Sequence, residues 1–176
     1  MKQIIPFTFL LFVFSSCGDS TVTDANDSAN SDSVTVDSAS KNMGIGGTYG
    51  FGSNPEVEAV GSLMVYTESD TTFLFALDFT RGAPSYNMGN IYSRAYLRNG
   101  TWTYNHSEAN EPEVCAIDFM FGEKFVQIVT RENGCGFGAN VIVDHVYDRT
   151  SSAIPQFFVG MENDTVYFSN LAKAVK

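Results

Sequence analysis

The chain has 176 residues, which is enough for one domain with accessory segments rather than for two full domains. Hydrophobic residues make up 44% and aromatic residues 14%, a composition that supplies a core and favours strands over helices. The formal net charge of −10 excludes nucleic acid as a partner and disfavours electrostatic binding to an anionic membrane, because the chain cannot neutralise a row of phosphates.

Residues 1–16 have the form of an export signal. Lys2 gives a minimal positive start, and residues 4–14 form an apolar run that only Pro6 and Thr8 interrupt. A run of this length falls short of the ~20 residues needed to cross a bilayer. We therefore predict a signal peptide rather than a transmembrane helix.

Small residues precede a cysteine at the end of this run, in the order Phe14-Ser15-Ser16-Cys17-Gly18. The segment resembles the lipobox of bacterial lipoproteins, although Phe14 stands where leucine is usual. The resemblance implies lipid attachment at Cys17 and a protein held in the cell envelope, at the outer membrane and facing either the periplasm or the surface. The chain has three cysteines, so assigning Cys17 to lipid leaves one pair.

Residues 17–43 are expected to form a disordered Asp/Ser-rich tether that begins with the lipidated cysteine. Residues 18–43 contain no aromatic residue and no apolar period, so they cannot bury enough surface to offset the entropy of ordering. Three Asp-Ser-apolar triplets there are similar to the sequon of a bacterial general O-glycosylation system, which would modify Ser28, Ser33 or Ser38. A linker of this composition also generates such triplets by chance, and both interpretations stay open.

Residues 44–176 are predicted to form one all-β domain. Its clearest element is a hairpin of residues 90–98 and 101–106 around Asn99-Gly100, because both residues of a two-residue turn of this type need positive φ. The turn places Leu97 opposite Trp102 and Ala95 opposite Tyr104 on an apolar face that we expect in the core. The pairs Tyr96/Thr103 and Arg94/Asn105 fall on the other face.

A second hairpin is predicted for residues 115–121 and 124–130, with Gly122-Glu123 as the turn. This register places Ile117 opposite Ile128 and Phe119 opposite Val126. Cys115 lies at the open end of the hairpin and Cys135 follows the return strand. We therefore predict a disulfide between Cys115 and Cys135, which would stabilise the domain by about 3 kcal/mol.

Further strands are expected at residues 57–67, 72–79, 140–147, 156–159 and 165–168, and a helical period is found only at residues 170–175. The prediction is a small antiparallel barrel or sandwich of about eight or nine short strands, because closure or stacking protects sheet edges.

The string Cys115-x-Ile117-x-Phe119-x-Phe121, then Cys135-Gly136-Phe137-Gly138-Ala139-Asn140-Val141 and Tyr147, carries a resemblance. It is similar to a small β-barrel domain of exported bacterial proteins, some of which are described as lysozyme-inhibitor-like. The likeness covers about residues 48–150. It implies a fold and a compartment, and it carries no catalytic residue.

No motif predicts a catalyst, a cofactor or a metal. Gly134–Gly138 precedes residues 141–143, which read as a strand, whereas a phosphate-binding loop needs a helix there. We interpret these glycines as a turn beside the disulfide. Asp144 and His145 would point to opposite faces of a strand, so with Asp148 they predict a surface histidine rather than a metal site.

The second histidine belongs to an acidic loop. The spacing of its acids matches no calcium-binding loop, so we interpret the segment as solvated. The residues concerned are His106, Glu108, Glu111 and Glu113.

The functional prediction is a non-enzymatic, membrane-anchored domain that binds a protein partner. Residues 44–176 carry fifteen Asp and Glu against eight Lys and Arg, about −7, which would attract a basic protein. An inhibitor of a basic, lysozyme-type enzyme is its most concrete form. The alternatives are a barrel that carries a small apolar ligand, as calycin-type barrels do, and a weak hydrolase.

Overall fold

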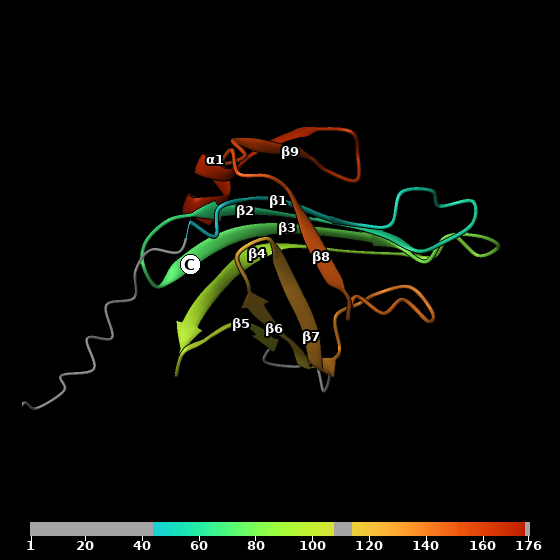
Figure 1. Ribbon diagram of the computed structural model, residues 1–176, viewed down its shortest axis with the longest axis horizontal. Coiled ribbons are helices and arrows are strands. Elements are labelled where there is room, and N and C mark those ends of the chain that lie inside the picture. Colours follow the sequence, from blue (N-terminus) through green and yellow to red (C-terminus); the bar gives the residue numbers. More distant parts are fainter. Residues whose placement is uncertain (1–43, 108–113, 175–176) are drawn as a thin grey trace, which may run out of the picture. The chain divides into compact units, whose positions relative to one another are not determined.

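The computed structural model describes residues 44–107 and 114–174 (Figure 1). These residues form ten strands and one short helix. The elements are β1 (Gly47–Phe51), β2 (Val60–Thr67), β3 (Thr72–Thr80), β4 (Met88–Arg98), β5 (Thr101–Ser107), β6 (Val114–Phe121), β7 (Phe125–Asn133), β8 (Val146–Ser151), β9 (Phe157–Val159), β10 (Thr165–Tyr167) and α1 (Phe168–Ala174). The signal peptide, Cys17, Ser28, Ser33 and Ser38 lie outside the described residues.

Strands β1 to β8 form a closed antiparallel barrel. Each strand pairs with the next along the chain, and β8 closes the barrel by pairing with β1. Closure leaves no unpaired edge in this sheet. The all-β prediction is confirmed, and of the two architectures that the sequence allowed the barrel is the one formed. Strands β9 and β10 form a separate two-stranded sheet.

The β4–β5 hairpin has the predicted turn and register. Asn99 and Gly100 both have positive φ, 51° and 81°, and Leu97 pairs with Trp102. The pairing covers Tyr96–Arg98 and Thr101–Thr103, after which β4 continues along β3 and β5 along β6. Ala95 and Tyr104 are both buried, as predicted, but they do not pair with each other. Ala95 pairs with a residue of β3, and Tyr104 pairs with a residue of β6.

The β6–β7 hairpin differs from the prediction by two residues. Phe119 pairs with Ile128 rather than Val126, because the turn is Glu123-Lys124 and the Gly122 N–H donates to the Phe125 carbonyl. Moving a two-residue turn by one position changes each partner by two, so the buried face is preserved. Gly122 instead leaves room for the partly exposed Phe125 ring, which a Cβ at this position would approach to 2.5 Å.

Three other predictions are corrected. Residues 140–145 are not a strand, and β8 begins only at Val146. Residues 57–59 belong to a loop, and β2 begins at Val60. Strand β1 was not predicted, because Gly47 and Gly50 within it and Gly46 just before it are glycines that weaken the β pattern.

The barrel interior is filled by side chains. Phe73, Phe75 and Phe119 are at most 1% exposed and contact one another with ring centroids 5.1 to 6.1 Å apart. Edge-to-face and tilted rings of this kind add to the stabilisation that burial gives. The aromatic residues that favoured strands in the sequence therefore form the core of the barrel.

A second apolar cluster lies on the outer surface of the barrel. Leu74 and Ala76 point outward from β3 and are covered by Phe158 of β9 and Phe168 of α1. Figure 1 shows β9 and α1 lying along this side of the barrel. The C-terminal segment is thus packed onto the domain by an apolar layer of its own.

Candidate functional site

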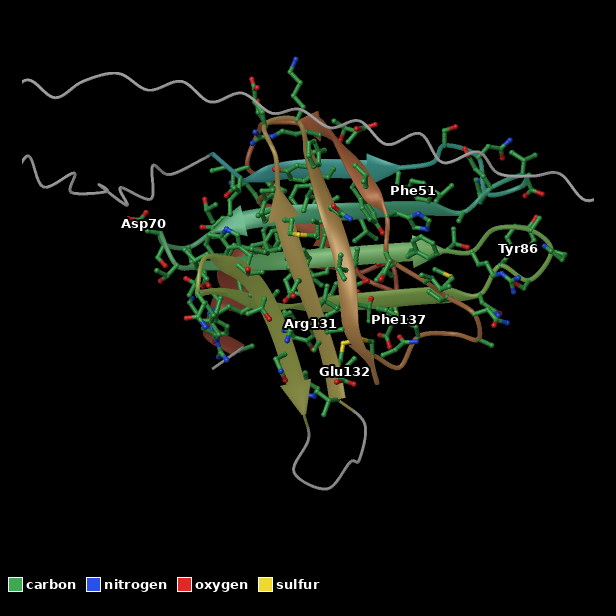
Figure 2. All side chains as sticks on the ribbon, turned by 60° about the horizontal axis from the view of Figure 1, so that its bottom comes forward. Phe51, Asp70, Tyr86, Arg131, Glu132 and Phe137 are labelled. Carbon is green, nitrogen blue, oxygen red and sulfur yellow. A yellow bond between two sulfur atoms is a disulfide. The ribbon has the colours of Figure 1, made fainter. Side chains whose placement is uncertain are left out.

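The connections at the two ends of the barrel differ in length. Short turns join β2 to β3, β4 to β5 and β6 to β7, whereas β1–β2, β3–β4 and β7–β8 are joined by residues 52–59, 81–87 and 134–145. We call the end with the longer connections the loop end. Figure 2 shows Tyr86 at the loop end and Asp70, from the β2–β3 turn, at the opposite end. Loops held on a closed barrel are a common place for binding residues.

The β1–β2 loop is braced by its own polar groups. The Glu58 carboxylate accepts hydrogen bonds from the Ser53 N–H at 2.8 Å, the Ser53 hydroxyl at 3.2 Å and the Asn54 N–H at 3.3 Å. The Asn54 side chain in turn accepts the Glu56 N–H at 3.0 Å. The bond from the Ser53 N–H is the main reason that the pKa of Glu58 lies below its usual value. The charged form of this residue therefore fixes the loop.

The β1–β2 and β3–β4 loops are joined to each other. The Tyr86 hydroxyl donates to the Glu56 carboxylate at 2.5 Å, and the Ala83 N–H donates to the Pro55 carbonyl at 2.8 Å. Gly82, with φ of 79°, sits where a Cβ would come within 2.2 Å of the Glu58 carbonyl oxygen. Residues 52–59 and 81–87 thus form one unit, which we call the loop pair.

The loop pair presents apolar side chains beside carboxylates. Val57 is 77% exposed, Tyr86 is 42% exposed, and Met88 at the start of β4 is 58% exposed. Glu56 and Glu58 flank Val57 in the sequence. Val57 thus forms an apolar tip between two carboxylates, and the backbone of the loops that carry them is already held by hydrogen bonds. Such a surface can bind another protein without first being ordered.

The β7–β8 loop closes the barrel at the loop end. Val141 and Val143 are buried in the main core, although they belong to no strand. The loop starts at the disulfide between Cys115 and Cys135, whose Cα atoms are 4.5 Å apart. The sequence therefore paired the two cysteines correctly, while Val141 and Val143 form a plug rather than part of a strand, and Ile142 between them is exposed.

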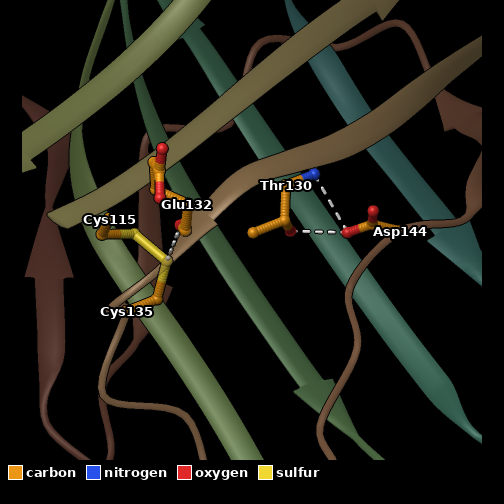
Figure 3. Close-up of a disulfide and its surroundings, with 5 residues drawn as sticks. All are labelled: Cys115, Thr130, Glu132, Cys135 and Asp144. Atoms are coloured by element: carbon orange, nitrogen blue, oxygen red, sulfur yellow. Dashed lines mark hydrogen bonds between the residues drawn. A yellow bond between two sulfur atoms is a disulfide. The ribbon is translucent and has the colours of Figure 1, made fainter. Parts of the chain in front are cut away.

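Hydrogen bonds fix the plug at both ends. Asp144 accepts the backbone N–H of Thr130 at 3.0 Å and its hydroxyl at 2.5 Å (Figure 3). The Asn87 side chain donates to the Ala139 carbonyl at 2.7 Å, so the plug is also tied to the loop pair. The three longer connections therefore share one polar network at the loop end.

His145 is not the surface histidine that the sequence predicted. Its ring stacks on Phe51 at 4.0 Å and lies parallel to Phe79 at 5.6 Å, where it is half-buried. Burial lowers the pKa of His145, and the nearby Asp144 carboxylate offsets this only in part. The predicted alternation with Asp144 fails because residues 144 and 145 precede β8.

The opposite end of the barrel is closed by a charged residue. Arg149 points inward from β8 and donates to the carbonyl oxygens of Gly44 and Gly46. Its guanidinium also lies over the Tyr49 ring, 5.6 Å from the centroid. A surface pocket of about 540 Å³ lies here, but Glu68 in its lining is already paired with Arg94 at 2.6 Å. We therefore place the candidate site at the loop end.

Within residues 44–107 and 114–174, no group of three or more His, Cys, Asp or Glu side chains could hold a metal ion. Glu108, Glu111 and Glu113 lie outside the described residues, so the interpretation of their loop as solvated stays a prediction. No helix in the described part of the chain is long and apolar enough to cross a membrane. Comparison with known proteins gives no match among family profiles, curated sequences or solved structures.

Sequence reasoning missed the loop pair. It assigned Val57 to a strand and gave no role to Glu56, Tyr86 or Gly82. The turn-forming residues Asn54-Pro55 and Gly82-Ala83-Pro84 were the signal that could have marked both loops. Their mutual contact could not be found this way, because the Tyr86–Glu56 bond joins residues 30 positions apart.

Proposed function

We propose that this chain is a lipid-anchored cell-envelope protein whose loop pair binds a protein partner. In its most concrete form the partner is a basic, lysozyme-type enzyme that the domain inhibits. The observation that carries the proposal is the joined loop pair, with the exposed Val57 at its tip and Glu56 bonded to Tyr86. Loops that are already held by hydrogen bonds lose little conformational entropy on binding. They can block the cleft of an enzyme without catalysing a reaction.

Charge supports a basic partner. The domain carries about −7, and opposite net charges raise association rates. Charge alone is screened beyond ~8 Å at physiological salt, so specific binding requires a buried contact as well. Val57 is the side chain best placed to make that contact, because it is the most exposed large hydrophobic residue among those described.

The filled barrel argues against the carrier alternative. A carrier needs an internal space, whereas interior residues such as Phe75, Leu77 and Ile117 are fully buried against one another. The plug formed by Val141 and Val143 occupies the barrel mouth at the loop end. We therefore favour binding by the outside of the domain over binding in its interior.

The test is an assay of cell-wall lysis by basic lysozymes of several types, with increasing amounts of the purified full-length protein at 150 mM salt. We expect inhibition that saturates near equimolar protein. Val57→Arg should abolish it, because the substitution places a cation against a basic partner and removes the apolar tip. The matched control is Val146→Arg on the wall of the barrel, where the valine is 50% exposed, and it should inhibit like the wild type.

Two outcomes would contradict the proposal. One is an absence of inhibition at large molar excess with every lysozyme type. The other is equal loss of inhibition in Val57→Arg and Val146→Arg, which would indicate non-specific attraction by net charge rather than binding by the loop pair.

The lipid anchor is tested separately. Cys17→Ala should leave the protein unprocessed or soluble, because the acylated residue is removed. Membrane fractionation and the intact mass of the wild type report the result. A variant that loses its signal peptide and still partitions fully into detergent would contradict lipidation at Cys17, and a wild-type mass equal to peptide plus lipid would exclude glycans on Ser28, Ser33 and Ser38.

A further inference from the structure

The hairpin of β9 and β10 has one apolar face packed on the barrel and a second one exposed. Phe158 points inward and is 2% exposed, whereas its neighbours Phe157 and Val159 point outward and are 51% and 56% exposed. Phe157 pairs with Tyr167 across the hairpin, and their rings lie 5.9 Å apart. The inward face of this two-stranded sheet is therefore apolar, and the outward face is apolar except for Thr165, which pairs with Val159.

Exposed apolar side chains also flank the two strands. Ile154, which precedes β9, is 46% exposed, and Met161 in the hairpin turn is 72% exposed. Scattered exposed apolar side chains are common on soluble proteins, but contiguous patches mark interaction surfaces. We call the outward side of this hairpin the hairpin face; it consists of Phe157, Val159 and Tyr167 on the two strands, with the exposed Ile154 before β9 and Met161 in the turn at its margins.

The hairpin face lies near the point where the proposed anchor joins the domain. A Cβ at Gly46 would lie 3.1 Å from Ile154, so the first described residues of the domain are next to the start of the hairpin. Residues 18–43 separate Cys17 from Gly44 and span at most roughly 90 Å when fully extended. A surface tethered within that distance of a bilayer meets it at high effective concentration.

We propose that the hairpin face docks on the lipid bilayer that holds the anchor; the inference rests on the proposed lipidation of Cys17. Aromatic and aliphatic side chains such as Phe157, Tyr167 and Val159 suit the boundary between headgroups and acyl chains. The contact would orient the domain on the membrane, which a tether alone cannot do.

The negative charge of the protein determines which lipid headgroups favour docking. The chain carries −10, and Glu162 and Asp164 lie in the turn of this hairpin. Docking is therefore driven by apolar burial and is favoured on zwitterionic lipid. Anionic lipid should weaken it by repulsion, and the weakening should diminish at high salt.

The experiment uses the full-length lipoprotein reconstituted into zwitterionic vesicles that contain lipids with nitroxide quenchers. An environment-sensitive fluorophore is attached at Val159→Cys or, as a matched control, at Val146→Cys, a valine of similar exposure on the barrel wall. Vesicle flotation reports the anchor, and quenching of the fluorophore reports docking. We expect both labelled proteins to float and the label at position 159 to be quenched several times more strongly.

Vesicles with anionic lipid should reduce the quenching at position 159 without changing flotation. The substitution pair Phe157→Ser/Tyr167→Ser should reduce it to the level of position 146, again with flotation intact. The comparison of the two labels does not depend on this variant, so a hairpin that loosens in it leaves the test valid.

Three outcomes would overturn the inference. Equal quenching at both positions in protein that floats would contradict docking and leave the anchor in place. A spectral shift at position 159 that grows with protein concentration, without lipid quenching, would mean that a second copy covers the face. Failure to float would contradict the anchor itself and the docking with it.

Discussion

The two ends of the barrel are both closed, but by opposite kinds of chemistry. At one end Arg149 reaches inward from β8 and satisfies backbone carbonyls with a charged side chain. At the other, Val141 and Val143 fill the opening with apolar groups, and a disulfide holds the segment that carries them. The first end needs only short turns, whereas the second needs long connections. Those connections leave room for a binding surface such as the loop pair.

Removing the disulfide should have the largest effect. The variant Cys115→Ala/Cys135→Ala releases a link between residues 20 positions apart, which should lower the free energy of unfolding by about 3 kcal/mol. Chemical denaturation measures the loss, and non-reducing peptide mapping of the wild type establishes the bridge. A loss far below 1 kcal/mol would mean that the buried valines alone hold the plug.

Truncating Arg149 should have the next largest effect. Arg149→Met keeps apolar volume over Tyr49 but leaves the carbonyls of Gly44 and Gly46 without their donor, which should cost about 2 kcal/mol. Arg149→Lys should recover only part of this, because one ammonium group replaces a planar fork. If Arg149→Met unfolds at the wild-type denaturant concentration, the two ends are closed in the same apolar way.

Loss of the Asp144 side chain should have a smaller, local effect. Asp144→Ala removes two hydrogen bonds to Thr130 at an exposed site and should cost about 1 kcal/mol. Hydrogen exchange at the Thr130 amide should accelerate more than exchange in β2 or β3. Asp148→Ala, an exposed acid on β8, is the control and should leave that amide unchanged. Equal acceleration in both variants would show that Asp144 does not fix the plug.

The smallest effect concerns pH at the plug. Burial lowers the pKa of His145 in the folded state below its ordinary value of 6.5, so protonation favours the unfolded state. The contribution of His145 is therefore fully present above pH 6.5 and is lost as the pH falls through the lower folded value. Thermal unfolding between pH 7 and pH 5 should show a smaller drop in Tm for His145→Phe than for the wild type. Identical pH profiles for the wild type and His145→Phe would contradict this account.

The sequence predicted the fold class because the relevant signals are local. Asn99-Gly100 specifies its own turn, and the alternation of residues on either side predicts which face is buried. The β6–β7 hairpin shows the limit of such signals: Gly122 looked like a turn glycine, but it makes room for the Phe125 ring. Face assignment survived this error because side chains alternate with a period of two.

Residues 140–147 show a different limit. The apolar run Val141-Ile142-Val143 is consistent with a strand, and only the barrel decides that the two valines plug its mouth while Ile142 is exposed. The candidate site is similarly hidden, because it depends on contacts between loops that are distant along the chain. Gly82 and Tyr86 acquire a role only when the β3–β4 loop lies against Glu56 and Glu58.

What the sequence by itself determined is the set of locally encoded features: an all-β domain, the β4–β5 hairpin, the buried faces of the main strands and the pairing of Cys115 with Cys135. What only the tertiary structure decided is the closure of the eight strands into a barrel, the two different ends and the exposed hairpin face. The physical reason is the separation along the chain of the residues that determine each feature. Turn conformations and alternation depend on neighbouring residues, whereas closure, plugging and loop–loop contacts depend on which distant segments the packed core brings together.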